Sequence, residues 1–160
     1  MTAVSAAIGN SETKLVQYII PANTLQVGST FRVTLYGTCT PANSATSNIR
    51  VRIGTAGSSS DVAAVNLAPT SATTGTNVPF SVVMMVTVRS TGASGTVDGN
   101  GMLTNFSYGT GIESNGVGVG TPIAGATVNT TVSNIIHVSY VTSNNSTKST
   151  FQIATIEAIN

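Results

Sequence analysis

The side chains that could carry out chemistry are few and lie far apart in this chain. There is one histidine, His137, in the middle of an expected strand, and one cysteine, Cys39, at the end of another. A metal site needs several His, Cys or carboxylate ligands, and a hydrolytic serine needs a motif such as G-x-S-x-G, which is absent. We therefore predict no enzymatic activity, no metal and no cofactor. We interpret His137 as a polar sheet-surface or interface residue and Cys39 as a small buried hydrophobic residue.

The charged residues form no recognisable site either. Residues 98–101, D-G-N-G, resemble the start of a calcium-binding EF-hand loop, but the spacing differs and the closing Glu is missing, so we interpret them as a β-turn. Arg32, Arg50 and Arg52 are expected on outer strand faces. With Arg89 they could meet a partner's carboxylates, a sugar or a phosphate, or only water. The five carboxylates lie in different loops and chain ends, and nothing pairs them: Glu12, Asp61, Asp98, Glu113 and Glu157.

The composition indicates that β-strands must position these residues. Only 7% of the 160 residues are charged, against about 25% in an ordinary soluble domain. Thr, Ser, Asn and Gly make up 75 residues, and Val (19) and Ile (12) far outnumber Leu (5). These residue types favour strands and turns. The net charge of +1 gives no electrostatic basis for binding nucleic acid.

Period-2 alternation bounded by turn residues predicts about nine strands and no long helix. We expect a single antiparallel β-sandwich of jelly-roll type over residues 15–160, all-β in class, preceded by an N-terminal arm of residues 1–14. Residues 109–125, rich in glycine, are expected to form a long surface loop. The strands are expected at residues 15–20, 31–39, 49–53, 62–67, 80–89, 95–108, 126–132, 134–142 and 150–158.

Two of these strands carry apolar residues on both faces. Val83 and Met85 in residues 80–89, and Ile135 and His137 in residues 134–142, lie on the faces that should contact water. Either a loop or another subunit must cover such a face. The scarcity of charge also favours an oligomer, because monomers stay soluble through charged surfaces. We therefore predict that these four residues belong to subunit interfaces.

No segment predicts secretion or a membrane span. The first ten residues lack the basic start and the long apolar core of a signal peptide. The longest strongly apolar run, residues 82–86, is far shorter than the roughly 18 residues needed to cross a bilayer. We therefore expect a protein that is made in the cytoplasm and has no membrane partner.

Three segments resemble a known group of proteins: residues 20–38, IPANTLQVGSTFRVTLYGT; residues 49–55, IRVRIGT; and residues 87–101, TVRSTGASGTVDGNG. In this order and at these distances they resemble bacteriophage virion proteins built on a single jelly-roll sandwich, which occur as head-decoration, head-fibre and tail-fibre modules. The resemblance covers residues 15–158. One departure is the region 135–140, where members of the group often have a Trp that this chain lacks.

The resemblance implies a structural protein on the outer surface of a virion, made in the host cytoplasm. Because the chain is nearly all jelly roll, without a fibre shaft, we expect a trimeric decoration protein that binds the major capsid protein. Thr2, Val4 and Ile8 in the N-terminal arm are the candidate anchor residues. The alternative is the receptor-binding tip of a short fibre or spike that recognises host surface glycans.

Overall fold

The strands predicted from the sequence are present in the computed structural model, which describes residues 4–6, 11–42, 44–69, 74–105, 117–119 and 121–159. Within these residues there is no helix, and hence none long and apolar enough to cross a membrane. Nine strands have six residues or more, and two have three. In chain order the strands are β1 (Val4–Ala6), β2 (Thr13–Ile20), β3 (Thr30–Thr40), β4 (Ser47–Gly54), β5 (Val62–Leu67), β6 (Val78–Ser90), β7 (Gly95–Asn105), β8 (Val117–Val119), β9 (Thr121–Val128), β10 (Asn134–Thr142) and β11 (Lys148–Ala158).

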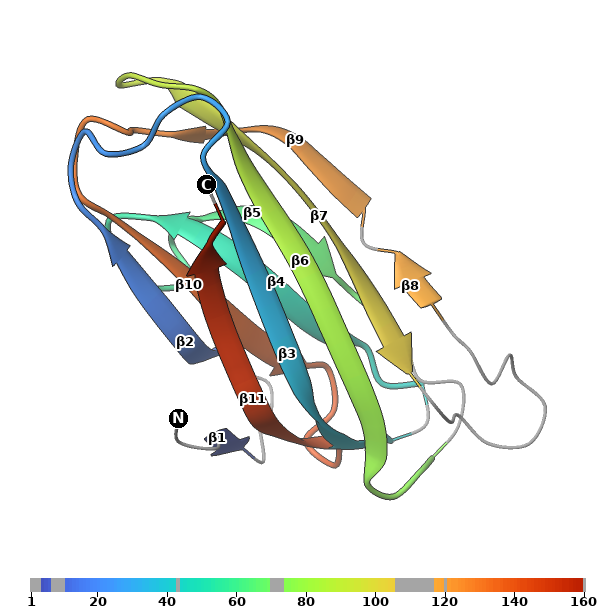
Figure 1. Ribbon diagram of the computed structural model, residues 1–160. Helices are drawn as coiled ribbons and strands as arrows, with labels where there is room; N and C mark the ends of the chain where they lie inside the picture. Colours follow the sequence, from blue (N-terminus) through green and yellow to red (C-terminus); the bar gives the residue numbers. More distant parts are fainter. Residues whose placement is uncertain are drawn as a thin grey trace.

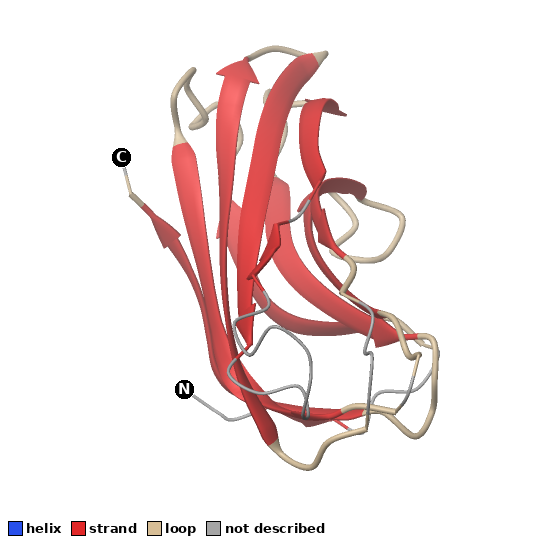
Figure 2. Ribbon diagram, turned by 90° about the vertical axis from the view of Figure 1, so that its right-hand side faces the viewer, coloured by secondary structure: helices blue, strands red, loops and turns tan. Residues whose placement is uncertain are grey.

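The strands form two antiparallel layers that face each other as a jelly-roll-like sandwich (Figures 1 and 2). The first layer, called here the β3–β6 sheet, has the order β1-β11-β3-β6-β7, with β8 also paired to β7. The second, the β4–β10 sheet, has the order β2-β10-β4-β5. β9 joins the two along one side, because Thr121 and Pro122 pair with β5 whereas residues 126–128 pair with β7.

The core lies between the two sheets and follows from the alternating sequence pattern. In β3 and β6 every second side chain is buried, as expected for strands with one face inward. Each fully buried aliphatic side chain stabilises the fold by about 1.5–3 kcal/mol relative to an exposed one. The inward residues that are completely buried include Val33, Leu35, Val82 and Met84 from one sheet and Val51, Ile53 and Val138 from the other.

One end of the core is filled by aromatic rings. The Phe151 ring centroid lies 5.4 Å from that of Phe80 and 5.3 Å from that of Tyr140, both in edge-to-face geometry. The buried Tyr140 hydroxyl accepts a hydrogen bond from Ser149 Oγ at 2.8 Å and lies 3.0 Å from Ser47 Oγ. Cys39 is buried in β3, as predicted.

The D-G-N-G sequence lies inside β7, so its interpretation as a turn is wrong. A Cβ at Gly99 would lie 2.1 Å from the carbonyl oxygen of Ala64, so only glycine allows β7 to pass this close to β5. The Asp98 carboxylate accepts the backbone N–H of Gly125 in β9 at 2.8 Å. Gly99 therefore serves a close approach of two strands, and the chain does not reverse here.

Several strand boundaries also differ from the prediction; β9, for example, begins at Thr121 and not at residue 126. The strand expected at residues 126–132 ends at Val128, because the Asn129 side chain accepts the backbone N–H and the hydroxyl of Thr131 and so forms a turn. β2 begins at Thr13, two residues earlier than expected. The last part of the strand expected at residues 95–108 lies outside the described residues after Asn105.

Candidate functional site

The outer face of the β3–β6 sheet carries Val83 and Met85. The register aligns Val83 with Met102 of β7, and Tyr36 of β3 with Ile153 of β11. Tyr36, Met102 and Ile153 are 45%, 47% and 41% exposed. These five side chains, called here the outer patch, therefore form a partly apolar surface that no loop within the described ranges covers.

Charged residues beside the outer patch are paired with one another. Arg32 Nη2 lies 2.6 Å from Glu157 Oε2, and Arg89 Nε lies 3.0 Å from Asp98 Oδ2. Exposed ion pairs of this kind stabilise a fold by at most about 1 kcal/mol. Each pair is internally neutral, so these residues give the border of the outer patch no net charge.

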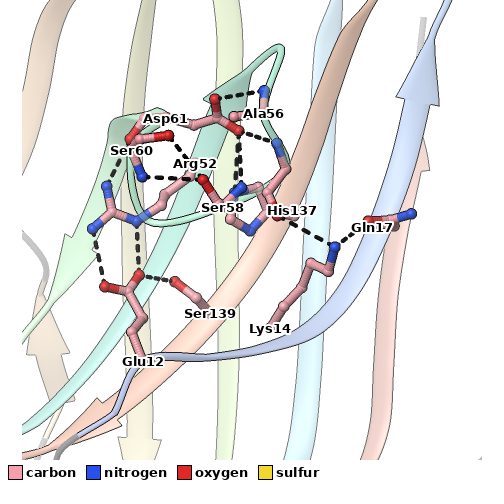
Figure 3. A network of polar contacts seen from close by, with 11 residues as sticks. Glu12, Lys14, Gln17, Arg52, Ala56, Ser58, Ser60, Asp61, His137 and Ser139 are labelled. Carbon is pink, nitrogen blue, oxygen red and sulfur yellow. Dashed lines mark hydrogen bonds and ion pairs between the residues drawn. The ribbon is translucent and has the colours of Figure 1, made fainter.

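Ile135 and His137 lie on the opposite side of the molecule, on the outer face of the β4–β10 sheet. There the β4–β5 loop, residues 55–61, lies over His137 (Figure 3), and Gly57 of the same loop approaches the half-buried Ile135. His137 is only 1% exposed. Gly57 has a φ of +61° and comes so close that a Cβ would lie 3.1 Å from Ile135 Cδ1. For this strand, a loop of the same chain covers the second face, and His137 adds nothing to the molecular surface.

The carboxylate of Asp61 holds this loop in place. Its oxygens accept the backbone N–H groups of Ala56, Gly57 and Ser58 at 3.0, 2.7 and 3.3 Å. Oδ2 also lies 3.5 Å from His137 Nε2. Burial lowers the pKa of His137, and the charge of Asp61 and the backbone of Ser58 offset this only in part. The ring is therefore neutral at physiological pH.

Glu12 is the centre of a second group of polar contacts next to the first (Figure 3). Its carboxylate accepts hydrogen bonds from Arg52 Nε at 2.7 Å, from Arg50 Nη1 at 3.0 Å and from the hydroxyl of Ser139. The hydrogen bond from Arg52 is the main cause that lowers the pKa of Glu12 to about 2, against the opposing effect of burial. Arg52 Nη1 also donates to the Asp61 carbonyl at 2.7 Å. Arg52 thus connects Glu12, at the start of β2, with the backbone of the β4–β5 loop.

The two groups of contacts are called here the polar cluster, and their hydrogen bonds and ion pairs hold segments of the same chain together. Its members are Glu12, Arg50, Arg52, Asp61, His137 and Ser139. The Ser139 hydroxyl donates to Glu12, so it is not paired with His137 as a nucleophile would be with its base. Across the described ranges, no three His, Cys, Asp or Glu side chains gather as metal ligands. The cluster ties the start of β2 and the β4–β5 loop to the sheet.

The predicted arm and loop are described only in part. Val4 lies in β1, where it pairs with Phe151 of β11, and Thr2 and Ile8 lie outside the described residues. Of the predicted glycine-rich loop, residues 117–119 form β8 and residues 121–125 belong to β9, so these residues are not loop. Residues 109–116 and residue 120 lie outside the described part.

Comparison with known proteins gives no family. No family model matches the sequence, and no curated protein matches it. Among solved structures, the chain is similar to the CBM2 module of the evolved Dit of Lactobacillus casei BL23 phage J-1. The two share 9% identity at a TM-score of 0.37, over 90% of this chain and 68% of the other.

Proposed function

We propose that the protein is a structural component of a bacteriophage particle, that it acts as a homotrimer, and that it decorates the outside of the capsid by binding the major capsid protein. The observation that carries the proposal is the outer patch, a partly apolar sheet face with no cover from the described residues. The resemblance of residues 20–38, 49–55 and 87–101 to virion jelly-roll proteins supports the same class of function.

Further copies of the chain are the partners that suit the outer patch best. Association removes apolar surface from water. Because the neighbouring ion pairs Arg32–Glu157 and Arg89–Asp98 are internally neutral, identical chains approach one another there without like-charge repulsion. Three copies around an axis also match the local three-fold junctions of a capsid lattice.

The N-terminal arm is the proposed anchor on the capsid. β1 pairs with β11 through only three residue pairs, Val4–Phe151, Ser5–Thr150 and Ala6–Ser149. Breaking these three residue pairs costs little free energy. The released segment can then pair with the edge of a sheet in a capsid subunit, because extended segments bind sheet edges through their backbone. Three arms on one trimer add avidity that a single arm lacks.

Light scattering of the protein and of Val83→Glu tests the subunit interface. We expect a wild-type mass of about 48 kDa, three times 16.1 kDa, and a monomer for the variant, because a buried unpaired carboxylate costs several kcal/mol. Ile19→Glu is the matched control, since Ile19 is 60% exposed on β2 of the other sheet and should leave the trimer intact. A monomeric wild-type protein, or a trimeric Val83→Glu, would contradict the proposal.

Electron microscopy of labelled protein on intact particles tests the location. We expect many copies across the head, and a few copies at the tail would instead favour a receptor-binding tip that recognises host surface carbohydrate. Deletion of residues 1–10 leaves Glu12 and its contacts in place. The truncated protein should still form trimers but no longer bind capsids, and unchanged capsid binding would rule out the arm as the anchor.

A further inference from the structure

A hollow of about 370 Å³ opens on the outer face of the β3–β6 sheet, at the side next to β9. Met85 is the one residue that it shares with the outer patch. The hollow extends from Met85 toward β9 and away from Tyr36. Its lining includes Met85, Thr87 and Arg89 of β6, Asp98 and Asn100 of β7, and Ile123 of β9.

Two polar groups of the hollow are held in fixed positions. Asp98 Oδ1 accepts the backbone N–H of Gly125 at 2.8 Å, and Oδ2 pairs with Arg89 Nε at 3.0 Å. The Asp98 carboxylate is therefore oriented from both sides and in turn orients the Arg89 guanidinium. Groups that are fixed before a ligand arrives cost less entropy when it binds.

Other polar groups of the hollow have free hydrogen-bonding capacity. Within the described ranges, the terminal nitrogens of Arg89 and the side-chain amide of Asn100 make no hydrogen bond. Both side chains are exposed. The hollow thus presents guanidinium donors, together with an amide that both donates and accepts.

The charge of the hollow selects against ionic ligands. Arg89 and Asp98 cancel each other, so a phosphate or carboxylate would have to approach Asp98, and a cation would have to approach Arg89. Met85 and Ile123 add apolar surface beside the polar groups. A ligand that fits both features has many hydroxyl groups, no charge, and C–H surfaces that can pack on apolar side chains.

We propose that this hollow binds a neutral saccharide. Hydroxyl groups of the sugar bond to the Arg89 guanidinium and the Asn100 amide, and its C–H face packs on Met85 and Ile123. A volume of about 370 Å³ lies in the lower range of ligand sites, which suits a short stretch of a glycan. The inference goes beyond the capsid-binding role proposed above and does not require it.

The experiment is binding of the full chain to an array of neutral and anionic oligosaccharides, followed by titration calorimetry with the best neutral glycan. We expect neutral glycans to be retained over sialylated and phosphorylated ones. Arg89→Gln and Asn100→Ala should each weaken binding at least about tenfold, because each removes hydrogen bonds to the glycan. Circular dichroism confirms that the variants are folded.

Arg32→Gln is the matched control. Arg32 also forms an exposed ion pair with a carboxylate on the same sheet face, but it lies outside the hollow. It should leave glycan binding unchanged. Absence of retained neutral glycans, a preference for anionic ones, or equal loss of binding in Arg32→Gln would overturn the inference. Because Met85 belongs to both the hollow and the outer patch, the titration is repeated on the Val83→Glu variant, in which no subunit contact covers the hollow, and the same preference for neutral glycans is expected there.

Discussion

Replacement of Glu12 by Gln should remove much of the acid sensitivity of folding below pH 4.5. The pKa of Glu12 falls from 4.5 to about 2 in the folded chain. At 1.36 kcal/mol per unit, this corresponds to about 3 kcal/mol of stabilisation from the ionised carboxylate. Because the folded pKa is depressed, the unfolded chain takes up the proton first as the pH falls. The stabilisation is therefore complete well above pH 4.5 and is lost progressively down to about pH 2.

The assay is urea unfolding from pH 7 to pH 2, followed by circular dichroism because the chain has no Trp. At pH 7 the Glu12→Gln variant should be less stable than the wild type by up to about 3 kcal/mol, because Arg50 and Arg52 lose their charged partner. The two proteins should converge as the pH approaches 2, where the wild-type carboxyl is protonated.

Glu157→Gln is the control for this prediction. Glu157 also pairs with an arginine, but its side chain is 48% exposed, whereas that of Glu12 is 15% exposed. The control should change stability by less than about 1 kcal/mol at any pH. If the wild-type and Glu12→Gln curves run parallel from pH 7 to pH 2, Glu12 does not stabilise the fold through its charge, and the reasoning fails.

Three further predictions concern buried groups. The stability of the wild type should also fall as the pH drops below 6.5, because unfolded His137 takes up a proton that the buried ring resists. His137→Gln should flatten that part of the urea-unfolding profile. Gly99→Ala should cost at least about 2 kcal/mol because its Cβ would meet backbone. Gly101→Ala should cost less because its Cβ would meet the Met84 side chain and not backbone, and thermal melting of both variants compares them. Burial raises the pKa of Cys39, so mass spectrometry should find it alkylated at pH 8 only in denaturant.

Much of the sandwich could be predicted because strand alternation is a local property. The positions of Asn134–Thr142 and Val62–Leu67 were obtained directly from the pattern of apolar residues. The turn at Asn129 was missed because a single side chain ended the strand, while the apolar pattern continued to Val132. The glycines at 99 and 101 were misread because glycine marks both turns and close strand contacts.

The polar cluster could be predicted only in part because its members come from distant segments. Alternation predicts that Arg50 and Arg52 share one outer face, but it leaves open whether they contact a partner's carboxylates, a sugar, a phosphate or only water. Nothing in the sequence showed that the partner is Glu12, 38 and 40 residues away. Likewise, both faces of the strand around His137 were recognised as apolar or buried, but a loop anchored by Asp61 covers the outer one.

The sheet order has a consequence for biosynthesis. β2 pairs with β10 and β3 with β11, so the partner of Thr40 is Lys148, 108 positions later in the chain. At a translation rate of about 5–20 residues per second, several seconds pass after β3 is made before β11, the second of its two neighbours, is synthesised. In that interval β3 can pair with β6, and the local hairpins β4–β5 and β6–β7 can form, but β2 has no partner until β10 is made. Such non-local pairing also slows folding. A nascent chain therefore leaves β2 unpaired until β10 is made, and a chain that stops before β11 cannot complete the β3–β6 sheet.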